Sequence, residues 1–264
     1  MSIDRFTVLA RTHNGIDLKV KNFTIEESDE WSPYVRGTIE AVYDYAVFNN
    51  QGVDYAPLDP RNPLKVPTIE IIIVRHYGDA GNSLARNDPD DPLAIGDADA
   101  PVVLIEWADM RCPFCAAVAN DTLPTIIDEY VETGKVRIEF HDVAFFGDES
   151  ARASAAVHAA AAQGRGMEYV QAVFAVAPPS GHPELPEEQL IEIAEQVGVA
   201  DIDAFTQQLR APEGTQNAQQ ATAIAQQIGV NAVPFFFDGS VALSGAQPLD
   251  TFRSYLDEAV AAAQ

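Results

Sequence analysis

The spacing of apolar positions changes twice between residues 102 and 143. The continuous apolar run "VVLIEW" at 102–107 is typical of a strand buried on both faces. Residues of about 113–133 then follow a helical period that ends at Gly134, and "VRIEFHDV" at 136–143 predicts a second strand. The helix face consists of Val118, Leu123, Ile126, Ile127, Tyr130 and Val131. Two strands joined by a helix predict a parallel, right-handed unit.

The pattern after this unit is mostly helical. Residues of about 148–228 are rich in Ala, Gln and Glu and predict several helices, broken at glycines and prolines. "PFFFDG" and "SVALSG" predict two short strands, because the Asp238-Gly239 pair between them favours a hairpin. Pro248 opens a last amphipathic helix. The fold class expected for residues 102–264 is therefore α/β.

Residues 1–78 have a different pattern, with short runs rich in Val, Ile, Thr and Tyr between turn signals. The runs are "FTVLA", "IDLKV", "YVRGTIEAVY" and "PTIEIIIVRHY", and Asn14-Gly15 is a hairpin signal. These residues predict a small, mostly-β domain. The polar, acidic stretch 79–101 is interpreted as a linker, which agrees with the two domains expected for 264 residues.

Charge excludes two classes of function. The formal net charge is −24, of which only −3 falls on residues 1–78 and −21 on residues 79–264. Nucleic acids and anionic membranes require a basic surface, so neither is an expected partner. The sequence shows no signal-peptide core and no apolar stretch approaching the ~18 residues of a membrane span.

The segment "MRCPFCAA" at 110–117 contains both cysteines of the chain. A disulfide between Cys112 and Cys115 closes so small a loop that it would stabilise the fold only weakly. A zinc site would need two further ligands, and no other cysteine or suitably spaced histidine pair is present. The third interpretation, a redox-active pair, is the one favoured here, and no metal is expected.

Redox chemistry suits the place of this pair between a strand and a helix. The helix N-terminus would stabilise a thiolate on Cys112, which then attacks, and Cys115 resolves the mixed disulfide one turn later. Pro113 suits the first turn of a helix, where its missing N–H costs nothing. Arg111 adds a nearby positive charge whose direction the sequence does not give.

Four motifs resemble the DsbA-like thioredoxin-fold oxidoreductases of actinobacteria over residues of about 86–264. They are "VVLIEWADMRCPFC", the helical block after "HDVAFFGDESARASAAVHAAAAQGR", "GVNAVPFFFDG" and "SGAQPL". The resemblance implies a thioredoxin core with a helical insertion at about 148–228. It also implies that Pro234 follows a cis peptide bond beside the active site, with Val233 presenting backbone to an extended substrate. A trans proline at a strand start is the alternative.

The resemblance further implies that Glu106 is a buried acid that exchanges a proton with Cys115. Burial would raise its pKa toward neutrality and suit it to acid–base work. The alternative is an edge-strand carboxylate that reaches solvent. The substrate side is expected to comprise Val233, Phe114 and Pro113.

The chain departs from the family at two points. The dipeptide between the cysteines is Pro-Phe, whereas the strongest oxidases of the family have Pro-His. Phe114 cannot stabilise the thiolate electrostatically, so the expected potential is less oxidising than the extreme, within about −270 to about −120 mV. Residues 22–76, in place of a membrane anchor, are similar to the opening domain of minor tail proteins from actinobacteriophages; a generic β-sandwich docking module is the alternative.

The sequence thus predicts a thiol-disulfide oxidoreductase that acts on protein thiols or disulfides, with a redox partner of unknown identity and no cofactor. The N-terminal module would dock to another protein. The family resemblance implies an extracytoplasmic location, in the cell envelope. The alternative is a phage tail or host-binding structural protein, associated with the virion, that carries a thioredoxin-fold domain; a mosaic gene or artificial fusion would also explain the change near residues 79–86.

Overall fold

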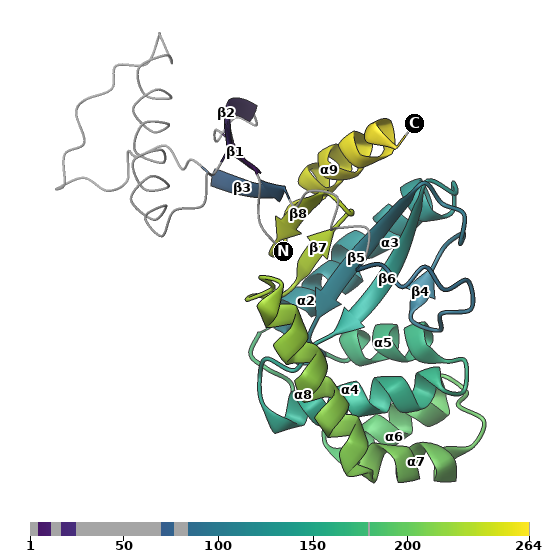
Figure 1. Cartoon of the computed structure of the whole chain (residues 1–264). Helices are drawn as coiled ribbons and strands as arrows, with labels where there is room; N and C mark the ends of the chain where they lie inside the picture. Colours follow the sequence, from purple (N-terminus) through teal and green to yellow (C-terminus); the bar gives the residue numbers. More distant parts are fainter. Residues whose placement is uncertain (1–4, 12–16, 25–69, 77–83, 179, 264) are drawn as a thin grey trace, which may run out of the picture. The chain divides into compact units, whose positions relative to one another are not determined.

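The computed structural model describes residues 5–11, 17–24, 70–76, 84–178 and 180–263 (Figure 1). The chain forms two units, residues 2–78 and residues 79–264. Each unit is described by itself.

The first unit contains an antiparallel group of three described strands. They are β1 (Arg5–Arg11), β2 (Asp17–Thr24) and β3 (Glu70–His76). Strand β1 pairs with both β2 and β3. These strands coincide with three of the four predicted runs, while residues 34–43 and the Asn14-Gly15 turn lie outside the described residues. The β-rich docking module therefore stays a prediction.

The second unit is built on a mixed sheet whose described order is β8-β7-β5-β6-β4. Its strands are β4 (Ala94–Ile95), β5 (Val102–Ala108), β6 (Val136–Asp142), β7 (Phe235–Phe237) and β8 (Val241–Ser244). Strands β5 and β6 are parallel, as predicted, and the pairs β4–β6, β5–β7 and β7–β8 are antiparallel. Strand β5 is central and almost fully buried, which explains its continuous apolar run.

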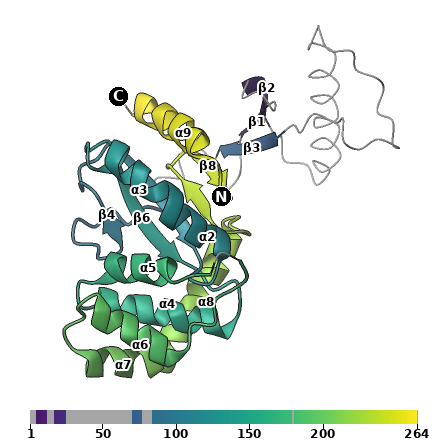
Figure 2. The same ribbon diagram turned by 180° about the vertical axis from the view of Figure 1, so that it is seen from behind.

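One helical stretch follows β5 and covers one face of the sheet (Figure 2). It comprises α2 (Pro113–Ala117), the π-helical turn η3 (Val118–Thr122), α3 (Leu123–Ile126) and a second π-helical turn η4 (Ile127–Val131). This confirms the helix predicted at about 113–133. The first π-helical turn is followed by α3, whose second residue, Pro124, has no N–H for a regular helical bond. The apolar face of the whole helical stretch packs on the sheet, in the same buried cluster as the last helix, α9 (Leu249–Ala262).

The helical insertion predicted at about 148–228 is confirmed. Its helices are α4 (Asp148–Ala161), α5 (Gly166–Ala175), α6 (Glu187–Gln196), α7 (Ile202–Arg210) and α8 (Pro212–Gln227). Figure 1 shows them gathered at the end of the sheet away from α9. Helix α8 approaches α4 closely at Gly214, because a Cβ there would lie only 2.7 Å from the Cβ of Ala155.

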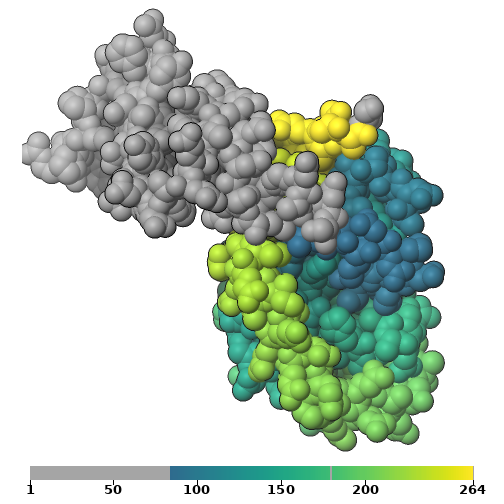
Figure 3. Space-filling view, in the orientation of Figure 1, coloured from purple at the N-terminus to yellow at the C-terminus, as the bar shows by residue number. Residues whose placement is uncertain are grey.

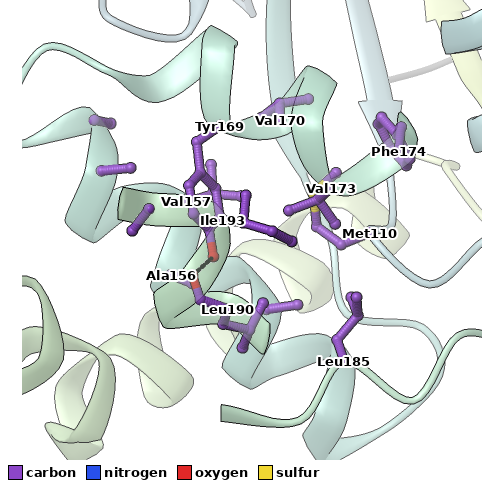
Figure 4. Close-up of a cluster of buried hydrophobic side chains, with 14 of the residues drawn as sticks. Met110, Ala156, Val157, Tyr169, Val170, Val173, Phe174, Leu185, Leu190 and Ile193 are labelled. Atoms are coloured by element: carbon purple, nitrogen blue, oxygen red, sulfur yellow. Dashed lines mark hydrogen bonds between the residues drawn. The ribbon is translucent and has the colours of Figure 1, made fainter. Parts of the chain in front are cut away.

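The insertion has its own buried cluster, which reaches the residues before the cysteine pair (Figure 4). Tyr169 of α5 is fully buried, and its hydroxyl donates to the carbonyl oxygen of Leu190 at 2.9 Å. Met110 and Leu185 belong to the same cluster and are 2% and 1% exposed. The insertion therefore packs directly against the turn that leads to Cys112.

The prediction of a linker at 79–101 is wrong for its described part, residues 84–101. Strand β4 pairs with β6, and Leu93 is 4% exposed within the core. The backbone N–H groups of Arg86 and Asn87 donate to the buried carboxylate of Glu139 at 2.7 and 2.9 Å. Figure 3 shows the blue residues at the start of this unit as part of one surface with the teal ones. The acidic composition suggested a linker, but the pairing of β4 with β6 and the bonds to Glu139 hold this segment on the sheet. The second unit therefore begins no later than residue 84.

Two fragments test this correction. A fragment of residues 84–264 should unfold cooperatively, whereas a fragment of residues 102–264 should be at least about 3 kcal/mol less stable. The shorter fragment loses buried Leu93 and leaves the Glu139 carboxylate without its two backbone donors. Urea denaturation of both fragments measures the difference. Equal stability would restore the linker interpretation.

Candidate active site

Cys112 is the N-cap residue of α2. Strand β5 ends at Ala108, a short turn follows, and Cys112 has extended backbone angles, φ −80° and ψ 117°. Its Sγ accepts the backbone N–H of Cys115 at 3.3 Å, one of the N–H groups that a helix start leaves without a partner. Pro113 occupies the first turn, as predicted, where a missing N–H costs no hydrogen bond. The sequence therefore places this sulfur at the positive end of the helix.

The two sulfurs have opposite electrostatic environments. The pKa of Cys112 is lowered, chiefly because the Cys115 thiol donates to its sulfur, with further help from the backbone N–H groups of Cys115 and Phe114. The pKa of Cys115 is raised well above its usual range, because the thiol is fully buried. The Cys112 sulfur raises it further, since it accepts a hydrogen bond from the Cys115 thiol and would repel a charge on it. Both cysteines are free thiols in the structure. Cys112 is thus the more acidic thiol of the pair and Cys115 the less acidic one.

Glu106 is buried inside β5 at 1% exposure, which agrees with the buried acid that the resemblance implied. Burial raises the pKa of its carboxyl to about 8. Its Oε1 has no hydrogen-bond partner among the described residues, and its charge contributes to the raised pKa of Cys115. A carboxyl that is neutral near pH 7 and has a free oxygen can give or take a proton.

The peptide bond between Val233 and Pro234 is cis. The carbonyl oxygen of Val233 lies 3.6 Å from Cys112 Sγ and accepts a hydrogen bond from the Cys112 thiol. The carbonyl oxygen of Pro234 accepts the N–H of Gly245 at 2.8 Å, which ties this turn to the end of β8. Two segments 121 residues apart thereby meet at the sulfur.

Phe114 is 65% exposed beside the cysteine pair, the largest exposed fraction among the large apolar side chains of the described part. Pro113 and Val233 are partly exposed near it. The side chains of all three residues are at least partly accessible to a substrate. Their contact with a substrate stays a prediction.

The direction of Arg111, which the sequence left open, is away from the sulfur. Its Nη2 pairs with Glu149 Oε2 at 2.5 Å, and its Nε and Nη1 donate to the carbonyl oxygens of Pro183 and Phe146 at 2.7 and 2.9 Å. Its charge is therefore directed to the insertion and to a carboxylate rather than to Cys112.

Asp109, the first residue after β5, was not predicted from the sequence as a site residue. This buried carboxylate accepts the N–H of Arg111 at 2.8 Å, the N–H of Phe145 at 2.7 Å and the hydroxyl of Ser150 at 2.8 Å. Burial raises its pKa, and these donors act in the opposite direction. An aspartate between a buried strand and "MRC" was the available signal. It fixes the turn that carries Cys112.

The described part of the chain shows neither a cluster of metal ligands nor a helix that could cross a membrane. Within those ranges, no three or more His, Cys, Asp or Glu side chains gather as metal ligands would. None of the helices described there combines the length and apolar character of a membrane crossing.

The sequence model of a family described as Thioredoxin matches residues 88–258. A probable disulfide bond formation protein D of Bacillus anthracis is 26% identical over 181 residues, 67% of this chain and 82% of its own length. BdbD from Bacillus subtilis (oxidised) aligns with a TM-score of 0.60 at 18% identity, covering 65% of this chain and 93% of its own. For alpha-DsbA1 of Wolbachia pipientis the TM-score is 0.60 at 23% identity, with 69% and 97% covered. These structures share the thioredoxin-like fold.

The raised pKa of Glu106 predicts a pH dependence of stability. Between pH 4.5 and about 8 the folded state keeps a proton that the unfolded state has lost, so stability falls as pH rises through this range. Glu106→Gln removes this term and should make the reduced protein more stable than the wild type at pH 8.5, by at most about 5 kcal/mol. At pH 4 the two should differ little.

Urea denaturation of the reduced protein at both pH values measures the effect. The matched control is Glu195→Gln, which removes an exposed carboxylate and should reproduce the wild-type curve. An equal difference between Glu106→Gln and wild type at the two pH values would contradict a raised pKa.

Proposed function

We infer that this chain, which belongs to the thioredoxin family, is a DsbA-like thiol-disulfide oxidoreductase that exchanges disulfides with protein substrates through Cys112 and Cys115. The observation that carries this inference is the asymmetry of the pair: one sulfur at a helix start with a lowered pKa, the other buried with a raised pKa. The names of the bacterial relatives, a disulfide bond formation protein and DsbA, support it.

In the oxidising direction, a substrate thiolate attacks Cys112 Sγ of the oxidised pair. A substrate–Cys112 disulfide forms, the Cys112–Cys115 bond breaks, and Cys115 leaves as a thiolate. A second substrate thiolate then attacks the substrate sulfur of the mixed disulfide and expels Cys112 as a thiolate. Two electrons pass from the substrate to the pair, and the substrate gains one disulfide.

The low pKa of Cys112 makes it the better leaving group in the second step. The high pKa of Cys115 means that its thiolate must be protonated in the first. Glu106 supplies that proton, since a carboxyl with a pKa of about 8 is protonated at neutral pH. In the reducing direction the same carboxylate removes the proton from Cys115 before it attacks.

The substrate lies in an extended conformation beside Val233–Pro234, with Phe114 and Pro113 as apolar contacts. Support comes from the 3.6 Å between Val233 O and Cys112 Sγ and from the exposure of the Phe114 ring. Any segment bonded to Cys112 must pass the backbone at Val233. The exposed ring supplies contact area without selecting a sequence.

We place this activity in an oxidising compartment of the cell envelope, because disulfides persist there, and a redox partner must regenerate the pair. The N-terminal module would determine where the enzyme docks. The alternative of a phage tail protein rested on residues 22–76, most of which lie outside the described residues, and the relatives above give it no support.

Trapping tests the proposed function. Oxidised wild-type protein should transfer its disulfide to a reduced, unfolded protein such as ribonuclease A. Cys115→Ser, mixed instead with disulfide-containing ribonuclease A, should accumulate a mixed disulfide, because Cys112 attacks a substrate disulfide, expels a substrate thiolate and has no resolving thiol beside it. Cys112→Ser should do neither, because the buried Cys115 thiol is protonated. Non-reducing electrophoresis and mass spectrometry measure both products. Equal trapping by the two variants would overturn the assignment of roles.

Phe114→His should make the pair more oxidising. An imidazolium near the Cys112 sulfur stabilises the thiolate and so the reduced form, and the expected rise is about 30 mV or more. Equilibration with glutathione redox buffers at pH 6 and pH 8 measures the potential, and Phe114→Leu is the control for loss of the ring. The rise should be larger at pH 6, where the imidazole is protonated. A potential unchanged at both pH values would show that this side chain does not reach the sulfur.

A further inference from the structure

The residue before Cys112 is held by two segments that are far from it in sequence. The Arg111 side chain is 11% exposed and contacts Glu149, at the start of α4, and the backbone of Phe146 and Pro183. Its carbonyl oxygen accepts the Nδ1–H of His182 at 2.8 Å. We call Arg111, Phe146, His182 and Pro183 the Arg111 clamp.

His182 is the exposed member of the Arg111 clamp. A carbonyl oxygen can only accept, so Nδ1 must carry the proton in this bond. The imidazole ring lies against the Phe146 ring, with centroids 4.0 Å apart and an angle of 37° between the planes. Three residues later Leu185 is buried in the same cluster as Met110. The Phe146 ring therefore packs against the imidazole, and the burial of Leu185 holds the backbone that carries His182.

We propose that His182 is a positioning residue, which fixes the peptide between Arg111 and Cys112 and thereby sets the reactivity of the Cys112 sulfur. The proposal deepens the proposed function and rests on it only for the reaction that this sulfur performs. It assigns a role to a side chain 70 residues away from the pair, in the segment between α5 and α6.

The physical route runs through the N-cap. Cys112 Sγ receives the Cys115 N–H at 3.3 Å, and this bond depends on how the Cys112 residue is tilted on the helix. Two bonds hold the tilt: the Cys112 N–H donates to Asp109 O at 2.9 Å, and His182 holds the carbonyl of the same peptide. Without His182 the carbonyl end of that peptide loses its partner. The sulfur then moves relative to the N–H that stabilises its thiolate.

The test uses full-length reduced protein and the pH dependence of Cys112 alkylation by iodoacetamide. His182→Ala should raise the pKa of Cys112 by at least about 0.5 unit, about a threefold loss of thiolate at pH values below the pKa. His182→Asn should restore the wild-type pKa, because its Nδ2–H lies near the place of Nδ1–H and can donate to Arg111 O. Glu184→Ala, an exposed change two residues away, should leave it unchanged.

A wild-type pKa in His182→Ala would overturn the proposal. An equal rise in His182→Ala and His182→Asn would also overturn it, since the ring and not the donated hydrogen bond would then matter. If His182→Ala fails to fold, His182→Gln takes its place, because its amide lies at the ε position and cannot donate to the same oxygen. Alkylation requires no disulfide substrate, so inactivity in the trapping experiment would contradict the proposed function and leave this result intact.

Discussion

The hydrogen-bonded contact of Cys115, through its thiol and its N–H, with Cys112 Sγ is the one on which the chemistry of this chain depends. It exists because Cys112 ends the extended segment and Cys115 lies one turn inside the helix. A charge on the first sulfur is solvated by the helix start, whereas a charge on the second would be buried. Moving the helix start by one residue would separate the sulfur from these donors and reduce the difference between the pKa values of the two thiols.

The parts of the fold that follow from local pattern could be predicted from the sequence. The buried strand β5, the helical stretch after it and the insertion each have an apolar period that their own residues define. The cysteine pair could be interpreted for the same reason, since its chemistry needs only a strand end, a helix start and a spacing of three. The burial of Glu106 was implied by the family resemblance, because the apolar pattern of "VVLIEW" left an edge-strand carboxylate open as the alternative.

Contacts between distant segments could not be predicted in this way. Residues 84–101 look like a linker because most of their side chains are polar, and only the partner strand β6 shows that Glu139 needs their backbone donors. Arg111 looked like a charge beside the thiolate until the positions of Glu149 and Phe146 were known. The bond between His182 and Arg111 joins residues 71 apart and leaves no local signal in the sequence.

The insertion packs at one end of the sheet and also forms polar bonds to the turn before Cys112. The thioredoxin core supplies β5 with Glu106 and the helix with Cys115, both of which are buried. The turn that joins them is held from the other side: Asp109 binds Ser150 of α4, and the guanidinium of Arg111 binds Glu149. Because that turn ends at Cys112, polar bonds to the insertion hold the residues before the pair, while both cysteines pack in the buried cluster that the insertion forms. The insertion can therefore change the reactivity of the pair without altering either cysteine.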